Sequence, residues 1–546
     1  MIKGKGYRIV SILCLFLLVL CTGCEDFQNT DMGDGAPEET LENTQADEDI
    51  TSSADGKKTL RYAIVKDPSN IDPQLASSSV EATIGFHVYE GLVKNNRGTV
   101  KNAMAKSYQI SQDGLTYTFY LRDASWSDGK AVTAQHFVDG IERLMNPKVK
   151  SSYSYLADCI ANVQATDEKT VVITLKEATP YFLNLLCMVN FSPVREDIIK
   201  KEGSSFAMRP STTVYDGPFV VSAWKKGRKI ILEKNKNYYN SDNISLDRVE
   251  IISVSNVEEA YKMYKSGDID FVEVNQASYL AEESNYNVDY DGGVEYLTFN
   301  FNNRYLQNKN LRLAISYAIN RSSLLQESGQ ELNEIATRYI MPDIDGVTGK
   351  YGEEQKYTPF SAEENRTESL NYLASALNEL KISDASEIKL ELLVENTQVK
   401  TKEGECIKKQ LETLLGIEVV LKKSSKVKKV NSEAKGDFCM TLTTWYPDYA
   451  DALSYIEIWE SSSIYNISCY NNKLLDNKLG EIRETSASKA RQRKISEAER
   501  VLCEDAALVP IQFSKKAILH SSSLTGLVTY YIGNNYNYIH ANKTTQ

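Results

Sequence analysis

Alternating hydrophobic and polar positions predict short β-strands along most of the chain. These runs are rich in β-branched and aromatic residues, which suit a pleated surface, and turn-forming residues separate them. The predicted strands cover residues 59–65, 117–121, 171–175, 229–233, 249–254, 296–301, 389–394 and 418–421.

Hydrophobic stripes with helical spacing predict helices between these strands. The clearest helix follows Asn256, a favourable N-cap with Glu259 at the capping-box position, and ends at Gly267. The predicted helices cover residues 80–89, 134–144, 257–266, 311–319 and 405–415. Because strands and helices alternate along the whole chain, we expect a mixed α/β protein with more than one lobe.

The amino terminus departs from this pattern and predicts an export signal. Three cationic residues precede an apolar run at residues 9–20, which is shorter than the ~20 residues that span a membrane. Small residues then precede Cys24, an arrangement that resembles the bacterial lipobox, although Cys21 stands where the lipobox usually has leucine. A redox or zinc pair of Cys21 and Cys24 is disfavoured, because no second CxxC follows. We expect residues 1–23 to be a lipoprotein signal peptide and Cys24 to carry the lipid, which would anchor the protein to the outer face of a bacterial cell membrane.

The next segment, residues 24–56, is predicted to be an acidic disordered tether. From residue 25 to residue 56 it has eleven Asp or Glu, no Lys or Arg and a single aromatic residue. Such a stretch cannot bury enough apolar surface to fold.

Composition narrows the classes of function. The 546 residues suffice for three or four domains of ~150 residues each. The formal net charge of −12 gives no electrostatic support for binding to nucleic acid. Tyrosine is frequent, with 33 residues against 15 Phe and 4 Trp, and tyrosine-rich surfaces suit binding.

Sequence motifs of enzymes and metal sites are missing. The chain has no GxxxxGK[ST], GxSxG, HExxH or EF-hand loop, and its four histidines disfavour a histidine-built metal centre. We therefore expect a protein that is not an enzyme and needs no metal or cofactor. Six cysteines beyond Cys24 are scattered without close pairs, which predicts mainly buried free thiols, although one or two disulfides also fit.

Several separated segments together resemble one family. They are VYEGLV at 88–93, LRDASWSDGKAVTA at 121–134, DGPF at 216–219, KNKNYY at 234–239, YKSGDID at 264–270, RLAISYAINR at 312–321 and WYPDYAD at 445–451. In this order, over roughly residues 60–535, they resemble the oligopeptide- and dipeptide-binding lipoproteins of ABC importers, solute-binding protein family 5.

The resemblance implies an α/β fold with the two lobes of a periplasmic binding protein and an additional domain inserted in the first lobe. Lobe I would comprise residues 57–90, 213–295 and 507–546, the inserted domain residues 91–212, and lobe II residues 296–506.

In that family the peptide lies extended between the lobes, and its backbone pairs with protein backbone as an added strand. Asp448 matches the aspartate that binds the peptide α-ammonium, through a charge-assisted hydrogen bond of ~1.5–3 kcal/mol. The alternative is that Asp448 is a turn residue after Pro447. The backbone candidates are residues 77–79 and 444–446, and Asp451 is a weaker candidate that fits a loop or cap. The expected peptide-binding residues are Asp448, Trp445, Tyr446, Thr444, Tyr449, Ser79, Ser77 and Tyr153; the aromatic ones would equally suit a core.

Two positions depart from the family pattern. Leu442 stands where some oligopeptide binders have an arginine for the peptide carboxylate, so a fixed peptide length is not supported. Ala452 replaces a common proline after Asp451, which would leave that loop less rigid.

The resemblance implies a monomeric, lipid-anchored protein that captures peptides and delivers them to the permease and ATPase subunits of an ABC importer. The alternatives are the same fold with a non-peptide ligand, such as a nickel chelate, haem or an oligosaccharide, or a receptor for signalling peptides.

Overall fold

The structure, a computed structural model, describes residues 56–96, 99–485, 488–532 and 535–544. An eleven-stranded mixed sheet runs through it in the order β15-β14-β16-β12-β17-β11-β1-β10-β9-β8, with β13 also paired to β17. Its strands are β1 (Thr59–Ile64), β8 (Phe219–Lys225), β9 (Lys229–Lys234), β10 (Arg248–Ser253), β11 (Phe271–Val274), β12 (Tyr286–Phe299), β13 (Glu334–Ile335), β14 (Lys389–Glu395), β15 (Glu418–Ser424), β16 (Met440–Trp445) and β17 (Leu508–His520).

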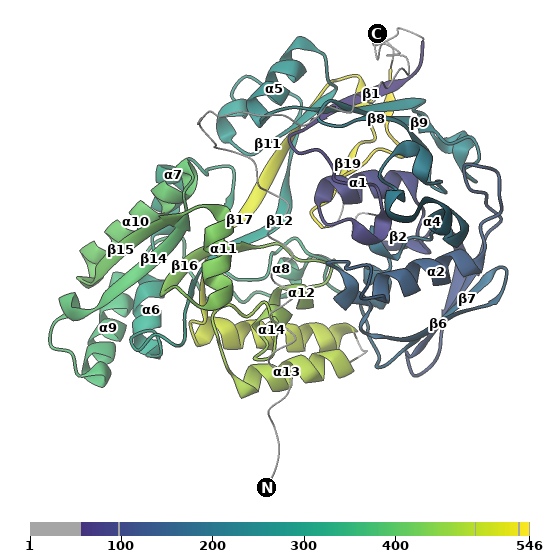
Figure 1. The fold of residues 1–546 in the computed structure, drawn as a ribbon. Helices are drawn as coiled ribbons and strands as arrows, with labels where there is room; N and C mark the ends of the chain where they lie inside the picture. Colours follow the sequence, from purple (N-terminus) through teal and green to yellow (C-terminus); the bar gives the residue numbers. More distant parts are fainter. Residues whose placement is uncertain (1–55, 97–98, 486–487, 533–534, 545–546) are drawn as a thin grey trace, which may run out of the picture.

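Two long antiparallel strands, β12 and β17, join the two halves of this sheet (Figure 1). The first part of β12 pairs with β17 beside β11, in the half that contains β1 and β8–β10, which we call the first lobe. The last part of β12 pairs with both β17 and β16, in the half that contains β14 and β15, which we call the second lobe. The register shifts between Tyr290 and Val294, and residues 291–293 are named the crossover bulge.

A separate antiparallel sheet of four strands, in the order β4-β5-β7-β6, lies at the right of Figure 1. We use the name inserted domain for this sheet and the elements that pack on it. Helix α2 packs on this sheet through an apolar face that includes Phe137, Ile141 and Leu144. The elements between β1 and β8 are α1 (Ser79–Val88), β2 (Val93–Asn96), β3 (Thr99–Asn102), β4 (Ala105–Ile110), β5 (Thr116–Leu121), α2 (Ala134–Met145), β6 (Ile160–Asp167), β7 (Thr170–Leu175), α3 (Phe182–Leu185) and α4 (Glu196–Glu202).

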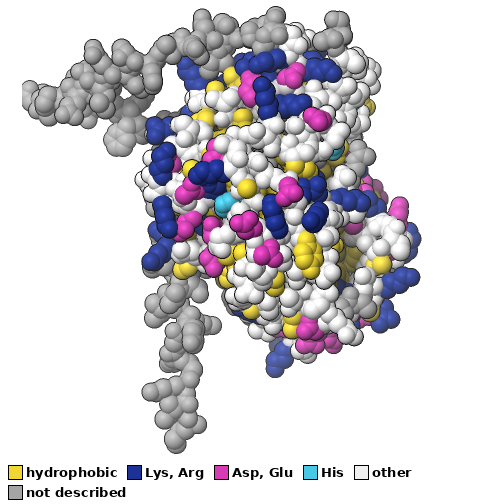
Figure 2. Space-filling model, turned by 90° about the vertical axis from the view of Figure 1, so that its right-hand side faces the viewer, with side chains coloured by type: hydrophobic (Ala, Val, Ile, Leu, Met, Phe, Trp, Pro, Cys, Tyr) yellow, Lys and Arg dark blue, Asp and Glu magenta, His cyan; other side chains and the backbone are white. Residues whose placement is uncertain are grey.

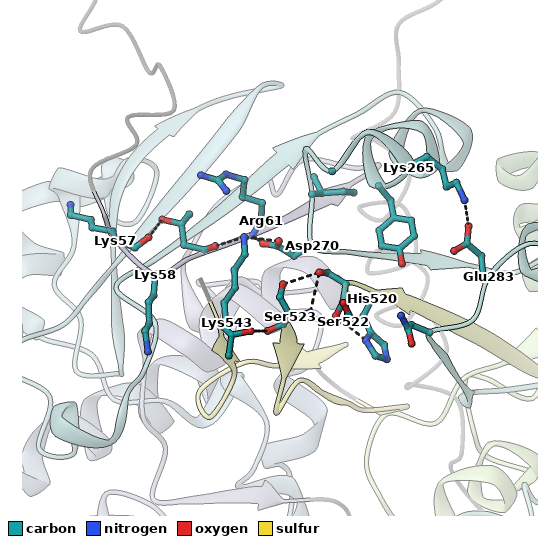
Figure 3. A pocket seen from close by; sticks show the side chains of 17 residues that line it. Lys57, Lys58, Arg61, Lys265, Asp270, Glu283, His520, Ser522, Ser523 and Lys543 are labelled. Atoms are coloured by element: carbon teal, nitrogen blue, oxygen red, sulfur yellow. Dashed lines mark hydrogen bonds and ion pairs between the residues drawn. The ribbon is translucent and has the colours of Figure 1, made fainter. Parts of the chain in front are cut away.

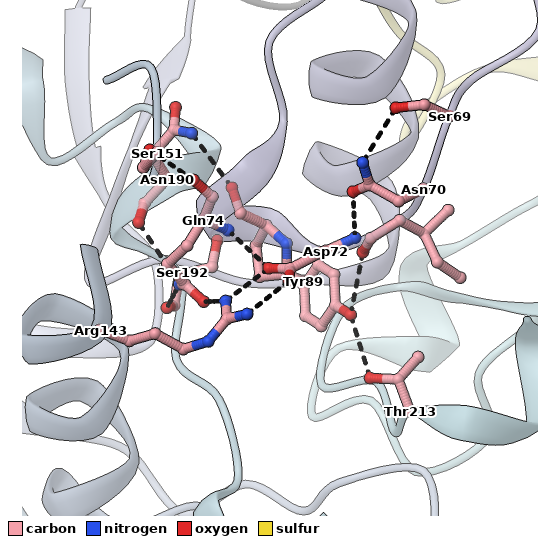
Figure 4. Close-up of polar contacts among 12 residues, drawn as sticks. Ser69, Asn70, Asp72, Gln74, Tyr89, Arg143, Ser151, Asn190, Ser192 and Thr213 are labelled. Atoms are coloured by element: carbon pink, nitrogen blue, oxygen red, sulfur yellow. Dashed lines mark hydrogen bonds and ion pairs between the residues drawn. The ribbon is translucent and has the colours of Figure 1, made fainter. Parts of the chain in front are cut away.

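Buried polar contacts fasten the inserted domain to the first lobe (Figure 4). Arg143 of α2 donates to both carboxylate oxygens of Asp72 at 2.6 Å, and also to the side chain of Gln74 at 2.8 Å. Asn190 donates to the carbonyl oxygens of Pro73 and Ala76 at 3.1 and 3.0 Å. These contacts fix the chain immediately before α1.

Helices cover both faces of the sheet in the second lobe (Figure 1). Strands β14 and β15 are parallel neighbours, and α10 crosses between them over a core that includes Leu390, Ile407 and Val419. The remaining helices are α5 (Val257–Ser266), α6 (Lys309–Ala318), α7 (Arg321–Ser328), α8 (Tyr351–Glu354), α9 (Arg366–Leu380), α10 (Gln398–Leu415), α11 (Lys426–Lys435), α12 (Leu453–Ile456), α13 (Lys473–Glu484) and α14 (Ser488–Glu504), and four two-residue strands, β18 (Leu524–Thr525), β19 (Val528–Thr529), β20 (Tyr536–Asn537) and β21 (Asn542–Lys543), follow β17.

The predicted mixed α/β architecture is confirmed, with two differences in extent. Helix α10 begins at Gln398 and not near residue 405, because its first turns carry the polar residues Lys400 and Glu403, which interrupt the apolar stripe. Strand β12 begins ten residues before its predicted start and passes through both lobes. The expected boundary between residues 295 and 296 therefore falls inside a continuous strand, and the division into domains stays a prediction.

The predicted signal peptide, Cys24 and nearly all of the predicted tether lie outside the described residues. Within the described part of the chain, no helix is both long and apolar enough to cross a membrane. The six cysteines described there are all free thiols, namely Cys159, Cys187, Cys406, Cys439, Cys469 and Cys503. On the face shown in Figure 2, acidic and basic side chains are interspersed and the hydrophobic patches between them are small.

Candidate ligand-binding cleft

A cleft of about 620 Å³ lies where the first lobe, the inserted domain and the second lobe meet. Its walls come from segments far apart in the sequence: the start of α1, residues 184–190, the crossover bulge and the loop after β16. Because different lobes supply the walls, a movement of one lobe against the other would change the shape of the cleft.

Asp448 lines this cleft immediately after β16 and is half-buried. One carboxylate oxygen accepts a hydrogen bond from the Tyr155 hydroxyl at 2.5 Å, and the Asp448 backbone N–H donates to the Ser454 hydroxyl at 3.1 Å. No Lys, Arg or His of the described residues forms an ion pair with Asp448. Burial raises the pKa of the Asp448 carboxyl, and the Tyr155 hydrogen bond opposes that rise. The cleft thus holds a carboxylate that no cation of the described residues pairs with.

Asp451, only three residues further along, has a different environment. Its two carboxylate oxygens accept hydrogen bonds from Arg491 at 2.8 and 2.9 Å, and one of them also accepts the Leu453 N–H at 2.9 Å. Asp451 is therefore a paired loop residue just before α12, whose N-cap is Ala452. The next residue, Ala452, is buried.

The four aromatic candidates occupy different environments. Tyr153 and Tyr446 line the cleft, and Tyr446 is 51% exposed. Tyr449 also borders the cleft, but it is only 3% exposed, stacks on Tyr181 with centroids 4.8 Å apart, and donates to Glu457 at 2.7 Å. The Trp445 indole donates to the Ser454 carbonyl at 2.9 Å and is not among the residues that line the cleft.

The backbone candidates lie on opposite walls. Ser77 and Ser79 line the cleft at the start of α1. The N–H groups of Ser77 and Ser78 already donate to the carboxylate of Glu81 at 2.9 and 3.1 Å, as part of a capping box. These donors are therefore engaged within the protein.

On the second lobe, the strand that carries Thr444 has one open edge. Thr444 pairs with Glu295 of β12 on one side. On the other side, β14 pairs with β16 at Met440 and Thr441, and no strand of the described residues pairs beyond that point. The edge at residues 443–445 therefore has the geometry that accepts an added strand. Leu442 lies in the buried core of this lobe.

Three side chains at or beside the cleft were not predicted from the sequence. Tyr155, the hydroxyl partner of Asp448, is 293 residues away in the sequence. Asp291 belongs to the crossover bulge and lines the cleft. Lys516 of β17 lines it as well and pairs with Glu273 of β11 at 3.3 Å. No motif links any of these residues to WYPD, so the fold alone reveals them.

A second hollow, of about 570 Å³, lies at the outer end of the first lobe and is named the outer pocket (Figure 3). Its acidic side chains are already paired: Asp270 with Lys543 at 2.7 Å, and Glu283 with Lys265 at 2.7 Å. The outer pocket thus resembles an ordinary surface network of charges, which makes the cleft the better candidate for a ligand.

The residues described by the structure contain no group of three or more His, Cys, Asp or Glu side chains that could hold a metal ion. The side chains that line the cleft offer hydrogen bonding, charge pairing and aromatic contact.

This arrangement, with two lobes joined by long strands and a polar cleft between them, defines a two-lobe solute-binding protein. The model of the bacterial extracellular solute-binding proteins, family 5, middle region, matches residues 99–466. The chain belongs to this family, which confirms the resemblance that the sequence segments indicated.

The chain is also similar to characterised members. It is 26% identical over 497 residues to the dipeptide-binding protein DppE of Bacillus subtilis, covering 88% of this chain and 91% of that one. It is 26% identical over 550 residues to the oligopeptide-binding protein OppA of the same organism, covering 96% and 97%. The substrate-binding domain of an oligopeptide ABC transporter from Bacillus anthracis superposes with a TM-score of 0.72 at 26% identity, covering 90% of this chain and 99% of that one. These relatives are binding proteins, and the predicted two-lobe fold is confirmed.

Proposed function

We propose that this chain captures peptides in the cleft between its lobes and delivers them to the permease of an ABC importer. The observation that carries the proposal is the position of Asp448, a carboxylate with no cationic partner among the described residues, three residues beyond a strand with an open edge. A peptide offers both complements at once, because its backbone can extend the sheet and its α-ammonium can pair with the carboxylate. The similar proteins DppE and OppA, which are a dipeptide-binding and an oligopeptide-binding protein, support this class of ligand.

In the proposed complex, the free oxygen of Asp448 accepts a hydrogen bond from the peptide α-ammonium. The Tyr155 hydroxyl keeps its hydrogen bond to the other oxygen. The peptide backbone pairs with residues 444–446 on one wall and lies against residues 77–79 on the other, where the Ser77 and Ser78 N–H groups remain bonded to Glu81. Tyr153 and Tyr446 supply aromatic surface. Since backbone hydrogen bonds provide much of the affinity, one cleft can accept many peptide sequences.

Contacts between the inserted domain and the second lobe would help to hold the closed form. Asn184 donates to the carbonyl of Ala450 at 2.7 Å, and Tyr181 stacks on Tyr449. We propose that these contacts break when the lobes open and re-form when a peptide is trapped, and that the permease recognises the closed form.

The amino-terminal assignments belong to the same proposal. Residues 1–23 would be removed, Cys24 would carry the lipid, and residues 24–56 would tether the folded part to the membrane. The folded part would divide into lobe I, the inserted domain and lobe II at the boundaries predicted from the resemblance, with the change of lobe in β12 placed at the crossover bulge. Mass spectrometry of the mature chain from membranes would test the anchor, because a diacylglyceryl adduct on Cys24 is expected.

Calorimetric titration of the purified mature chain with a tetra-alanine peptide, and with its N-acetylated form, tests the role of Asp448. Wild-type protein should prefer the free amine. In Asp448→Asn the affinity for the free-amine peptide should fall about 10–100-fold, with little change for the acetylated one. Equal losses for both peptides would make Asp448 a structural residue.

Native mass spectrometry of the same preparation tests the class of ligand separately. A heterogeneous set of co-purified masses that match short peptides is expected. A single non-peptide mass would overturn the proposal in favour of another ligand on the same fold.

A further inference from the structure

Asp291 is held in a defined place on the cleft wall by the crossover bulge. Gly292, with φ of 91°, lies so close to the Tyr531 carbonyl that a Cβ atom there would be 2.3 Å from its oxygen. The bulge also turns the Gly293 N–H toward Asp291, which accepts it at 2.9 Å. The Tyr446 hydroxyl approaches the other carboxylate oxygen at 3.5 Å. The Asp291 side chain is thus oriented by its surroundings and faces the cleft.

No described Lys, Arg or His forms an ion pair with Asp291. Lys516 is the cation on the neighbouring strand, but its ammonium pairs with Glu273 at 3.3 Å and lies over the Tyr536 ring at 5.6 Å. Lys400, which lies beyond Tyr446, forms ion pairs with Glu295 and Glu403. Burial raises the pKa of the Asp291 carboxyl, as it does for Asp448, while the Gly293 N–H and the positive charge of Lys516 partly oppose the rise at Asp291.

The charges that line the cleft therefore do not balance. Glu273 and Lys516 neutralise each other, and Lys426 is exposed at the start of α11, where water can solvate it. Among the described residues that line the cleft, Asp448 and Asp291 are the two carboxylates that form no ion pair. Closing the lobes over a ligand excludes water, and an unpaired charge is costly in a site without water. A peptide α-ammonium would satisfy one of the two carboxylates and leave the other unpaired.

We infer that Asp291 is a specificity-determining residue that binds the cationic side chain of a lysine or arginine in the peptide. The inference rests on the proposed function and narrows its ligands to peptides with a basic residue. Tyr446 contacts Asp291 and stands two residues before Asp448, so both carboxylates belong to one stretch of cleft wall. The basic side chain is therefore expected near the amino end of the peptide.

The test uses eight tetrapeptides made of alanine, each with one lysine or one norleucine at position one, two, three or four. Norleucine keeps the length of the lysine side chain and removes its charge. The affinity of the mature wild-type chain for each peptide is measured by calorimetry. At one position, the lysine peptide is expected to bind about 10–100-fold more tightly than its norleucine twin.

Asp291→Asn keeps an oxygen that can accept the Gly293 N–H. It should bring the ratio between the affinities for the lysine peptide and its norleucine twin to near one. Two variants serve as controls. Asp289→Asn removes a carboxylate on the same strand that accepts a hydrogen bond from Thr529 and should keep the ratio. Asp448→Asn should weaken both twins together and also keep it.

Equal binding of lysine and norleucine peptides by the wild type would overturn the inference and leave the proposed function intact. A lysine preference that persists in Asp291→Asn would overturn it too. If no tetrapeptide binds the wild type, the proposed function fails together with the inference. The wild-type comparison requires no variant to fold, so the test stands even where a substitution destabilises the chain.

Discussion

A carboxylate in the buried base of the second lobe and a carboxylate in the wall of the cleft have opposite environments: the first is paired with a cation and the second is not. In the base, Glu499 is fully buried, pairs with Arg338 at 2.7 Å and accepts a hydrogen bond from Tyr351 at 3.1 Å. It also accepts two backbone N–H groups, at 3.1 and 2.9 Å. In the cleft, the Asp448 carboxylate accepts the Tyr155 hydroxyl and meets no cation of the described residues.

This difference distinguishes charges that stabilise the fold through a partner in the protein from charges that are available to bind a ligand. Removing one member of a buried pair leaves its partner buried and uncompensated, which destabilises the folded state. Removing a carboxylate that has no partner relieves the folded state of a desolvated charge. The two regions should therefore respond to the same kind of substitution with opposite effects on stability.

The largest effect is expected for Glu499→Gln. Glutamine keeps the shape but leaves Arg338 buried without a counter-charge, so the free energy of unfolding should fall by about 3–5 kcal/mol. Urea denaturation followed by circular dichroism measures the change, and Arg338→Met in the same background shows whether the loss belongs to the pair. A fall below ~1 kcal/mol, the range of exposed ion pairs, would contradict this reading.

A pH-dependent effect is expected from Glu457, which is half-buried and accepts a hydrogen bond from the Tyr449 hydroxyl at 2.7 Å. Burial raises the pKa of this carboxyl from its ordinary value of 4.5 to about 7. Between these values the folded state holds a proton that the unfolded chain has lost, so stability should fall as the pH rises from 4.5 to about 7. The total is about 3 kcal/mol.

Glu457→Gln should remove this contribution and keep the hydrogen bond from Tyr449. Denaturation of both proteins across that pH range measures the difference between their slopes. If the two slopes are parallel, Glu457 does not titrate in this range.

A smaller effect distinguishes the two neighbouring aspartates. Asp451→Asn removes the counter-charge of Arg491, which is mostly buried, and should lower the free energy of unfolding by about 2 kcal/mol. Asp448→Asn should leave stability unchanged or raise it at neutral pH, because burial raises the pKa of that carboxyl.

The sign for Asp448 follows from linkage. The folded state binds the Asp448 proton more tightly than the unfolded chain, so the penalty is complete above the raised pKa and disappears below the ordinary one. The difference in melting temperature between wild type and Asp448→Asn should therefore vanish in acid. A loss of stability in Asp448→Asn at neutral pH would remove the contrast between the two aspartates.

The elements that the sequence predicted well are those with strong local signals. Helix α5 follows Asn256, whose side chain accepts the Glu259 N–H, and ends at Gly267, which has φ of 81°. The predicted capping box differs in one detail. The Glu259 carboxylate accepts a hydrogen bond from the N–H of Ser255, the residue before the N-cap. Strand β12 was predicted only in its second half. In its first half Tyr286, Val288 and Tyr290 alternate with polar residues, but this run is short, is not buried on one face and ends at Gly292 and Gly293 of the crossover bulge.

The residues of the candidate site likewise divide into those that local sequence signals predict and those that only the fold brings together. Asp448 could be found because it stands in a local motif, WYPD, that resembles a family pattern. Tyr155 and Asp291 could not, because their proximity to this motif depends on tertiary contacts over sequence separations of 293 and 155 residues. Whether a carboxylate has a cationic partner is likewise invisible in the sequence: Asp448 and Asp451 are three residues apart, and only the fold brings Arg491 to one of them.

The smallest effect is expected in the outer pocket, where the charges are matched and Lys543 is partly exposed although Asp270 is buried. Lys543 pairs with Asp270 at 2.7 Å, and its side chain is 24% exposed. Asp270 also accepts the Arg61 N–H at 2.7 Å, so it keeps a hydrogen-bond donor when Lys543 is replaced. Lys543→Met should therefore lower the free energy of unfolding by about 1 kcal/mol or less. Its affinity for tetra-alanine should equal that of the wild type, measured by the same calorimetric titration as for Asp448→Asn. A clear loss of peptide affinity in Lys543→Met would show that the outer pocket and the cleft are coupled, and the distinction between structural charges and ligand-binding charges would then fail for the first lobe.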